Sequence, residues 1–384
     1  MSSTKAWLRA RIRPIAVRDR TIAEQKSTLT KLRGERERYR QQIETLTQDL
    51  EHTRTAHHLE QERQRERANG TPSFQHLLHS LRQQANISVR YDGSAQTPLM
   101  QIPYKLRNYR LAQSHGIAVP EILAVWESAA AVRDLGHLPA QFVLKSDGGA
   151  GSSGVFLLER TGTDGYTMLG TTSTFSEHEL TSHLASLDSR RVRPPFFVEA
   201  FLNTGPSTGP IPEDVKIYAS HGRILQVMLR RVGKHGAPST IRTRFVDAEG
   251  EDLGSVALDR TGDDTIPLPQ WLPEMVATAR HLSRAIGVPF CRVDLYDGVD
   301  GPILGEITRA PGGTQRYSED HDRWMGEQWL RGAVDLGRDL AGGRPYGVLH
   351  GDHPATNFYP AGHLSQAADP GPWQQQVVHC GRWC

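Results

Sequence analysis

Cysteine is scarce in this chain, with three residues among 384, and their number is odd. So few cysteines argue against a disulfide framework and favour a reducing compartment. Long apolar runs are missing too, because no stretch approaches the roughly 20 residues that span a bilayer. Residues 1–20 contain arginines throughout and lack a secretory apolar region. We therefore expect a cytoplasmic protein.

Neither sign of charge is in large excess, since 45 Lys and Arg stand against 43 Asp and Glu. This balance argues against a dedicated nucleic-acid binder. The charge is uneven along the chain, however. Residues 1–70 hold 16 basic and 10 acidic residues, so they carry +6 and the remainder carries −4 of the overall +2. The N-terminal part is basic and the rest is mildly acidic.

Proline is absent from residues 21–67, where Gly34 is the one glycine. A heptad seam predicts a coiled-coil helix over residues 21–68, after a basic tail over residues 1–20. The first seam position holds Ile22, Leu29, Ile43 and Leu50, and the second holds Leu32, Tyr39 and Leu46. Other seam positions are polar or charged, so a solvated helix is the alternative. A homodimer, a heterologous partner and a peripheral contact with an anionic membrane remain open.

Short strands and helices alternate from Ser73 onward, and several strand pairs read as hairpins. This texture predicts an α+β fold rather than a doubly wound parallel sheet. We divide it into an N-terminal α/β part (71–139), a lid with a glycine loop (140–204), a central and C-terminal part (205–345) and a Gly/Pro-rich tail (346–384). The tail holds residues spaced like metal ligands, although we prefer a solvated tail. They are His350, His353, His379, Cys380 and Cys384.

The strongest chemical signal is the stretch of residues 291–313. A hairpin centred on Asp300 places Asp294 opposite Glu306 and Arg292 opposite Thr308, with all four side chains on one face. Two facing carboxylates repel, so a purely structural sheet would avoid them. Mg²⁺ turns the repulsion into coordination, since it binds one or two carboxylates together with substrate phosphates. We interpret the pair as a metal site; another register, or simple neutralisation of Asp294 by Arg292, is the alternative.

A glycine- and serine-rich loop follows Lys145 and ends at Gly154. Its amides and hydroxyls can point at phosphate oxygens, and the candidates are Gly149, Gly151, Ser152 and Ser153. Residues 155–158 read as strand, which excludes a Rossmann site. Protein-kinase motifs and a Walker A sequence are missing as well. The loop is therefore interpreted as a nucleotide flap entered through a lysine, with a flexible hairpin as the alternative.

Together these segments resemble the ATP-grasp superfamily, and its TupA-like branch in particular, over roughly residues 100–345. Beside the hairpin and the glycine loop, the motifs are Tyr104–Arg107 before Gly116–Pro120, Phe142–Lys145, Phe197–Leu202 and Asp214–Lys216. The resemblance implies an ATP-grasp fold, in which two α+β subdomains clasp ATP, preceded here by the coiled-coil helix.

The resemblance also implies roles for individual residues. For ATP these are Lys105 and Lys145 at the phosphates, Glu199 with the backbone of Ala200 and Leu202 at adenine, Asp214 near ribose, and Lys216 near phosphate. Arg292 and Lys216 would serve catalysis, and Asp294 and Glu306 would bind Mg²⁺ or Mn²⁺. Thr308 replaces the asparagine that many ATP-grasp ligases place beside the metal, so it is the weakest of these candidate ligands.

The activity implied by the resemblance is ATP- and Mg²⁺-dependent ligation of a carboxylate and an amine through an acylphosphate, with release of ADP. Small-molecule, peptide or glycan substrates from cell-envelope polysaccharide, glycopeptide or peptide natural-product biosynthesis are expected. A phosphotransferase on the same site is one alternative, and a nucleotide-binding coiled-coil adaptor without turnover is another. The intact Lys145, Asp294 and Glu306 disfavour the adaptor.

Overall fold

The chain forms two units, Met1–Thr71 and Pro72–Cys384. The computed structural model describes residues 3–68, 70–91, 97–149, 154–162, 165–187, 192–202, 211–234, 237–313, 315–366 and 377–384. Within these ranges, no helix is both long and apolar enough to cross a membrane.

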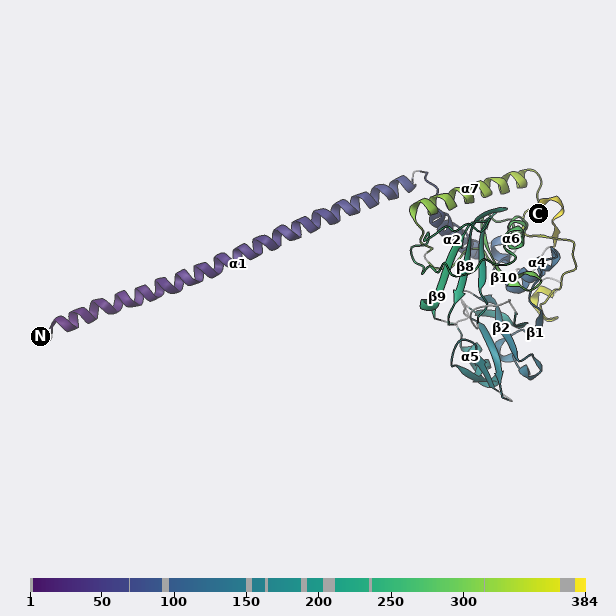
Figure 1. Ribbon diagram of the computed structural model, residues 1–384, viewed down its shortest axis with the longest axis horizontal. Helices are drawn as coiled ribbons and strands as arrows, with labels where there is room; N and C mark the ends of the chain where they lie inside the picture. The colour runs from purple at the N-terminus through teal and green to yellow at the C-terminus, as the bar shows by residue number, and fades with distance from the viewer. Residues whose placement is uncertain are drawn as a thin grey trace. The chain divides into compact units, whose positions relative to one another are not determined.

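The first unit is a single helix, α1 (Ser3–Ala68) (Figure 1). It begins well before the predicted start at residue 21, so most of the predicted basic tail continues the same helix. All of its described side chains, at residues 17, 18 and 20–62, are exposed. The predicted apolar seam therefore lies open on this helix, and the coiled coil stays a prediction.

The second unit is built on two antiparallel sheets, which confirms the predicted α+β class. The first sheet contains β1 (Ile122–Trp126), β2 (Gln141–Gly149), β3 (Val155–Thr161), β4 (Gly165–Met168), β5 (Thr174–Ser176) and β6 (Val192–Ala200) in the order β1-β6-β2-β3-β4-β5. The second contains β7 (Asp214–Ser220), β8 (Arg223–Val232), β9 (Ile241–Val246), β10 (Cys291–Gly298) and β11 (Gly301–Thr308) in the order β11-β10-β7-β8-β9.

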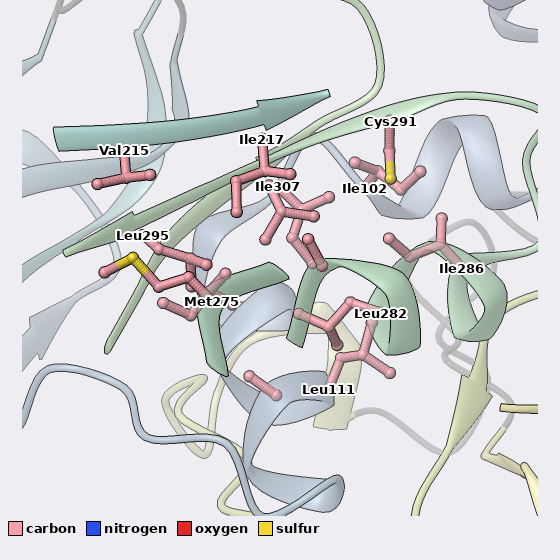
Figure 2. Packing of buried hydrophobic residues seen from close by; sticks show 14 of the residues in the cluster. Ile102, Leu111, Val215, Ile217, Met275, Leu282, Ile286, Cys291, Leu295 and Ile307 are labelled. Carbon is pink, nitrogen blue, oxygen red and sulfur yellow. The ribbon is translucent and has the colours of Figure 1, made fainter. Parts of the chain in front are cut away.

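One face of the five-stranded sheet is apolar because alternate residues of its strands are aliphatic. Figure 2 shows Val215, Ile217, Leu295 and Ile307 on this face, packed against α6 (Leu272–Ile286). Helix α4 (Lys105–Ser114) contributes Leu106 and Leu111 to the same core. Helix α6 ends at Gly287, whose φ of 71° suits glycine. A Cβ on Gly287 would also lie 2.6 Å from the Gly347 carbonyl oxygen.

The opposite face of this sheet is divided into an aromatic part and a charged part. Helices α2 (Phe74–Tyr91) and α7 (Glu319–Ala341) pack over the aromatic part. There the rings of Phe290 and Trp329 stack with centroids 4.4 Å apart, and Phe74 meets both edge-on. The charged part lies beyond Tyr218 on β7 and β10, and it carries the predicted site residues Asp214, Lys216, Arg292 and Asp294.

Shorter elements complete the second unit. They are α3 (Pro98–Gln101), α5 (Glu177–Ser186), β12 (Leu349–His350), β13 (Val378–His379) and 3₁₀ turns at Ala129–Ala131, Leu135–His137, Pro238–Thr240, Leu364–Gln366 and Gly381–Trp383. Helix α5 covers the six-stranded sheet and starts with a capping box, in which Glu179 N donates to Ser176 Oγ at 3.3 Å and Ser176 N donates to Glu179 Oε2 at 2.8 Å. In Figure 1 this sheet and α5 lie on the far side of the five-stranded sheet from α7.

The prediction of a solvated tail is wrong for part of the described tail. Leu349, His350 and Tyr359 are buried. The tail docks on the end of α4, where Gly351 N donates to Ser114 Oγ at 3.0 Å and His353 N donates to Ser114 O at 2.9 Å. Proline and glycine here shape a partly packed segment, two of whose backbone donors are satisfied by Ser114 at the end of α4.

The cysteines form one short bridge and no framework among the described residues. Cys380 and Cys384 are joined as a disulfide, and Cys291 is free and buried. The bridge spans four positions of the chain, so it constrains the end of the tail rather than the two sheets.

Candidate active site

The β10–β11 hairpin has the predicted register at the four candidate site residues and a different register nearer the turn. Asp294 pairs with Glu306 and Arg292 pairs with Thr308. The turn is shorter than a hairpin centred on Asp300 requires, because Gly298 pairs with Gly301. A bulge at Gly305 absorbs the difference, and a Cβ there would lie 2.8 Å from the Tyr296 ring. The two carboxylates therefore face each other because a bulge and a two-residue turn compensate.

Arg292 connects the four side chains on this face. Its Nε lies 2.6 Å from Asp294 Oδ1 and its Nη2 lies 2.7 Å from Asp294 Oδ2. The same Nη2 lies 3.3 Å from both Glu306 Oε1 and Thr308 Oγ1. Burial opposes the charge of Arg292, yet Asp294 raises its pKa above the ordinary value. Neutralisation of Asp294 by Arg292 thus coexists with the facing carboxylates.

The neighbouring strand β7 continues the charged row. Lys216 lies beside Asp294 in the ladder, and its Nζ forms ion pairs with Asp294 and, at 2.5 Å, with Asp214 Oδ2. Arg230 on β8 donates from Nε to Asp214 Oδ1 at 2.7 Å. Burial alone would raise the pKa of Asp214, but Arg230 and Lys216 hold it far below the ordinary value. Asp214 is therefore ionised and held by two cations.

The six-stranded sheet contributes a second pair. Lys145 on β2 forms a buried ion pair with Glu199 on β6. The Tyr109 hydroxyl, from α4, lies 2.8 Å from Glu199 Oε2 and 3.1 Å from the Gly305 carbonyl oxygen. Burial and the Glu199 charge raise the pKa of Tyr109 well above its ordinary value, so it stays a hydrogen-bond donor. Through Tyr109 this pair is connected to the bulge of the β10–β11 hairpin.

Lys105 begins α4 and lies against the start of the glycine loop. Its Nζ donates to Ser146 O at 3.1 Å, and burial lowers its pKa. Asp147 holds the same helix end, because its Oδ1 accepts from Leu106 N at 2.8 Å. The other oxygen, Oδ2, accepts from the Tyr359 hydroxyl of the tail at 2.7 Å. The first turn of α4, the glycine loop and the tail are thus joined at Asp147.

Glu306 shows that the separate pieces form one site. Although burial works in the other direction, the pKa of Glu306 falls to about 2. The cations responsible are Lys105 on α4, Arg292 on β10, Lys216 on β7 and Lys145 on β2. Four cations from four separate segments of the sequence therefore lower the pKa of one carboxylate.

The remaining predicted residues lie around this centre. Gly149 is the last residue of β2, and Leu202 follows β6. The Ala200 amide donates to Glu121 O at 2.9 Å, so this expected adenine contact is occupied within the protein. Gly151, Ser152 and Ser153 lie outside the described residues. The end of the loop is close to β2, since Ser146 N donates to Gly154 O at 2.9 Å.

The donor set fits Mg²⁺. Asp294 and Glu306 offer carboxylate oxygens on one face, and about a third of the Glu306 side chain is exposed. Among the residues that the structure describes, no three His, Cys, Asp or Glu side chains are grouped to bind a metal by themselves. Two carboxylates that leave positions for substrate phosphates are what Mg²⁺ uses in nucleotide sites. The His and Cys residues of the tail likewise form no such group.

Three residues of the site were not anticipated as members of it. Tyr109 could have been found, because it stands four positions after Lys105 and hence on the same face of α4. Asp147 could also have been found, because it stands two positions after Lys145 on β2 and residues two apart share one side of a strand. No sequence pattern pointed to Tyr359, because its hydrogen-bond partner Asp147 is 212 positions away in the chain.

A sequence profile of the TupA-like ATP-grasp family matches residues 85–330. The chain belongs to the TupA-like ATP-grasp family. Membership makes it an ATP-grasp ligase, an enzyme that uses ATP with Mg²⁺. No curated protein matches the chain.

Solved ATP-grasp structures resemble this TupA-like chain at low identity. The D-alanine–D-alanine ligase from Bacillus anthracis is 15% identical with a TM-score of 0.40, over 64% of this chain and 70% of that one. N5-carboxyaminoimidazole ribonucleotide synthetase is 11% identical with a TM-score of 0.39, over 66% and 55%. The L-amino acid ligase from Bacillus licheniformis is 13% identical with a TM-score of 0.33, over 57% and 43%. This chain therefore spans between 43% and 70% of their lengths.

Proposed function

We propose that this TupA-like enzyme joins a carboxylate to an amine through an acylphosphate intermediate. The observation that carries the proposal is the facing pair Asp294 and Glu306 with Arg292 and Lys216 bonded to it, where Lys105 and Lys145 also help to lower the pKa of Glu306. Buried cations around a carboxylate that faces a second carboxylate suit a triphosphate with its Mg²⁺, because phosphoryl transfer needs positioning and charge neutralisation more than covalent help.

In this proposal Lys105, Lys145 and Lys216 bind the phosphates, and Arg292 faces the transferring group. Asp294 and Glu306 would hold Mg²⁺, with Thr308 beside them; the cation supplies charge neutralisation at the phosphates when bound. Adenine would lie at the end of β6 near Glu199 and Leu202, and ribose near Asp214. The six-stranded sheet with its glycine loop, through Gly149, Gly151, Ser152 and Ser153, would act as the lid of residues 140–204.

The chemistry proceeds in two balanced steps. A carboxylate oxygen of the substrate attacks the γ-phosphorus, the bond to the β-phosphate oxygen breaks, and ADP leaves. The amine nitrogen then attacks the acyl carbon, phosphate leaves with its oxygen, and the amine proton passes to solvent or phosphate. The glycine loop would exclude water from the acylphosphate. The substrate carboxylate and the amine are the nucleophiles of the two steps, so the reaction requires no nucleophilic side chain from the enzyme.

We infer that the substrates come from cell-envelope polysaccharide, glycopeptide or peptide natural-product biosynthesis, in the cytoplasm. The family name supports a polysaccharide role, since TupA denotes a teichuronic acid biosynthesis protein, and the basic first 70 residues would allow contact with an anionic membrane surface.

Hydroxylamine trapping tests the proposal. The enzyme is incubated with ATP, Mg²⁺ and a panel of amino acids, peptides and sugar acids, and products are scored by mass. We expect a hydroxamate and equal amounts of ADP and phosphate with the right carboxylate. A stable phosphorylated hydroxyl product without hydroxamate would establish a phosphotransferase instead. The Glu306→Gln variant serves as the control for contaminating ATPases.

A further inference from the structure

Helix α1 carries an apolar seam that its own unit leaves open. The seven apolar seam side chains from Ile22 to Leu50 are 41% to 67% exposed. The helix is continuous over this region, because α1 runs without a break from Ser3 to Ala68. Gly34 falls at the outermost heptad position, away from the seam, so it does not interrupt it. A polar helix with such a seam gains stability when it packs against another helix.

The residues beside the seam identify the partner. With Ile22 at the first seam position, a, the residues that precede each a position are Thr28, Glu35, Gln42 and Asp49. Those that follow the other seam position, d, are Lys26, Arg33, Arg40, Thr47 and Arg54. One flank is therefore acidic or neutral and the other is basic.

This division favours two parallel copies. In a parallel pair each residue before a meets the partner residue five positions later, which pairs Glu35 with Arg40 and Asp49 with Arg54. No such pair between residues 21 and 61 joins like charges. In an antiparallel pair the basic flanks would face each other and repel.

Arg36 strengthens the assignment because it occupies an a position within an apolar seam. In a parallel pair it lies next to Glu35 of the partner, which can compensate its charge. A shift by one heptad would place Arg36 against Leu29 or Ile43 and leave a guanidinium in an apolar layer. One charged seam residue thus specifies the alignment at some cost in affinity.

We propose that α1 is a parallel, in-register coiled coil with a second copy of this chain, aligned by Arg36 and by the Glu35–Arg40 and Asp49–Arg54 pairs. Both copies of residues 72–384 then follow the same end of the coiled coil. The proposal rests on α1 alone and is independent of the reaction proposed above.

Cysteine cross-linking of the full-length protein tests the orientation. Gln25→Cys places a thiol at a d position, where two parallel, in-register helices bring it beside its own copy. We expect most of the chain to migrate as a disulfide-linked dimer after mild oxidation. Thr30→Cys, on the outer face, is the matched control and should stay monomeric on the gel, as should wild type.

An antiparallel pair gives the opposite pattern. Gln25→Cys alone would not cross-link, whereas a mixture of Gln25→Cys and His57→Cys chains would. That result overturns the proposed orientation. A full-length protein that sediments as a monomer at tens of micromolar overturns the second copy as partner and leaves a heterologous helix.

Charge reversal tests the pairing. The double variant Glu35→Arg and Asp49→Arg places like charges at four contacts of a dimer, so its dissociation constant should rise roughly ten- to a hundredfold. A second variant, Arg40→Glu and Arg54→Glu, should be weakened in the same way, and an equimolar mixture of the two should recover dimerisation. Unchanged self-association of both variants would refute the pairs. Helicity measured by circular dichroism at saturating protein concentration controls for misfolding.

Discussion

The hydrogen bond from Tyr359 to Asp147 provides the sharpest test of the site's construction. Tyr359→Phe removes one hydroxyl that donates to a buried carboxylate at 2.7 Å and keeps the ring. Hydrogen bonds to charged groups contribute about 1.5–3 kcal/mol, so we expect a loss of about 2 kcal/mol in the free energy of unfolding. This corresponds to roughly a thirtyfold change in the folding equilibrium.

The loss should depend on pH in a definite direction. Burial raises the pKa of Asp147, and the bond from Tyr359 is one of the contacts that oppose the rise. Without the hydroxyl the folded-state pKa rises further above its value in the unfolded chain. The penalty for folding with ionised Asp147 is therefore present at high pH and disappears as pH falls and the carboxyl takes up a proton. The variant should approach wild type as the pH is lowered through the raised pKa of Asp147.

Function should change in KM more than in kcat. Asp147 also caps the first turn of α4, which carries Lys105 against the glycine loop. A looser anchor misplaces a group expected to bind phosphate, so the KM for ATP should rise roughly three- to tenfold with kcat within threefold.

Urea unfolding followed by tryptophan fluorescence gives the stability, and steady-state ADP release gives the kinetics. Tyr346→Phe is the matched control, because that side chain is 65% exposed and its loss should cost under about 0.5 kcal/mol. A Tyr359→Phe loss no larger than the control's, or one that grows as pH falls, would refute this account.

Three further outcomes are expected. Asp294→Asn and Glu306→Gln should each abolish Mg²⁺-dependent turnover and leave the circular dichroism spectrum unchanged, since a lost metal ligand costs several kcal/mol in the transition state; activity within threefold of wild type for both would remove the metal assignment. Gly305→Ala should cost about 1–3 kcal/mol in urea unfolding, because its Cβ would lie 2.8 Å from the Tyr296 ring; wild-type stability would show that the ring can move aside. Deletion of residues 1–68 should change the sedimentation coefficient from dimer to monomer and leave ATP binding by calorimetry nearly unchanged; lost nucleotide binding would make α1 part of the catalytic unit.

The sequence could predict those parts of the site that follow a local period. Alternation along a strand put Arg292 and Asp294 on one face, and pairing across the turn then fixed Glu306 and Thr308. The bulge at Gly305 could not be predicted from the sequence, because it depends on packing against the Tyr296 ring.

Contacts between residues far apart in the chain could not be predicted from the sequence either. The contacts of Lys145 with Glu199 and of Tyr359 with Asp147 join segments that only the complete fold brings together. The tail was misjudged for the same reason, since its Gly/Pro content describes its backbone and says nothing about the α4 surface that receives it. Composition indicates how a segment can bend, whereas burial depends on what lies beside it.

The bulge at Gly305 has a consequence for how relatives of this chain are compared. With a two-residue turn and no bulge, Asp294 would face residue 305, and the second carboxylate would point to the opposite side of the sheet. Turn length and bulge are therefore linked, because a relative with the same spacing and a three-residue turn would keep the same pair without a bulge. The number of residues between the two carboxylates therefore does not by itself show whether the extra residue lies in the turn or in a bulge. An alignment should match the strands first and place its gap at the bulge or the turn, wherever the facing pair is preserved.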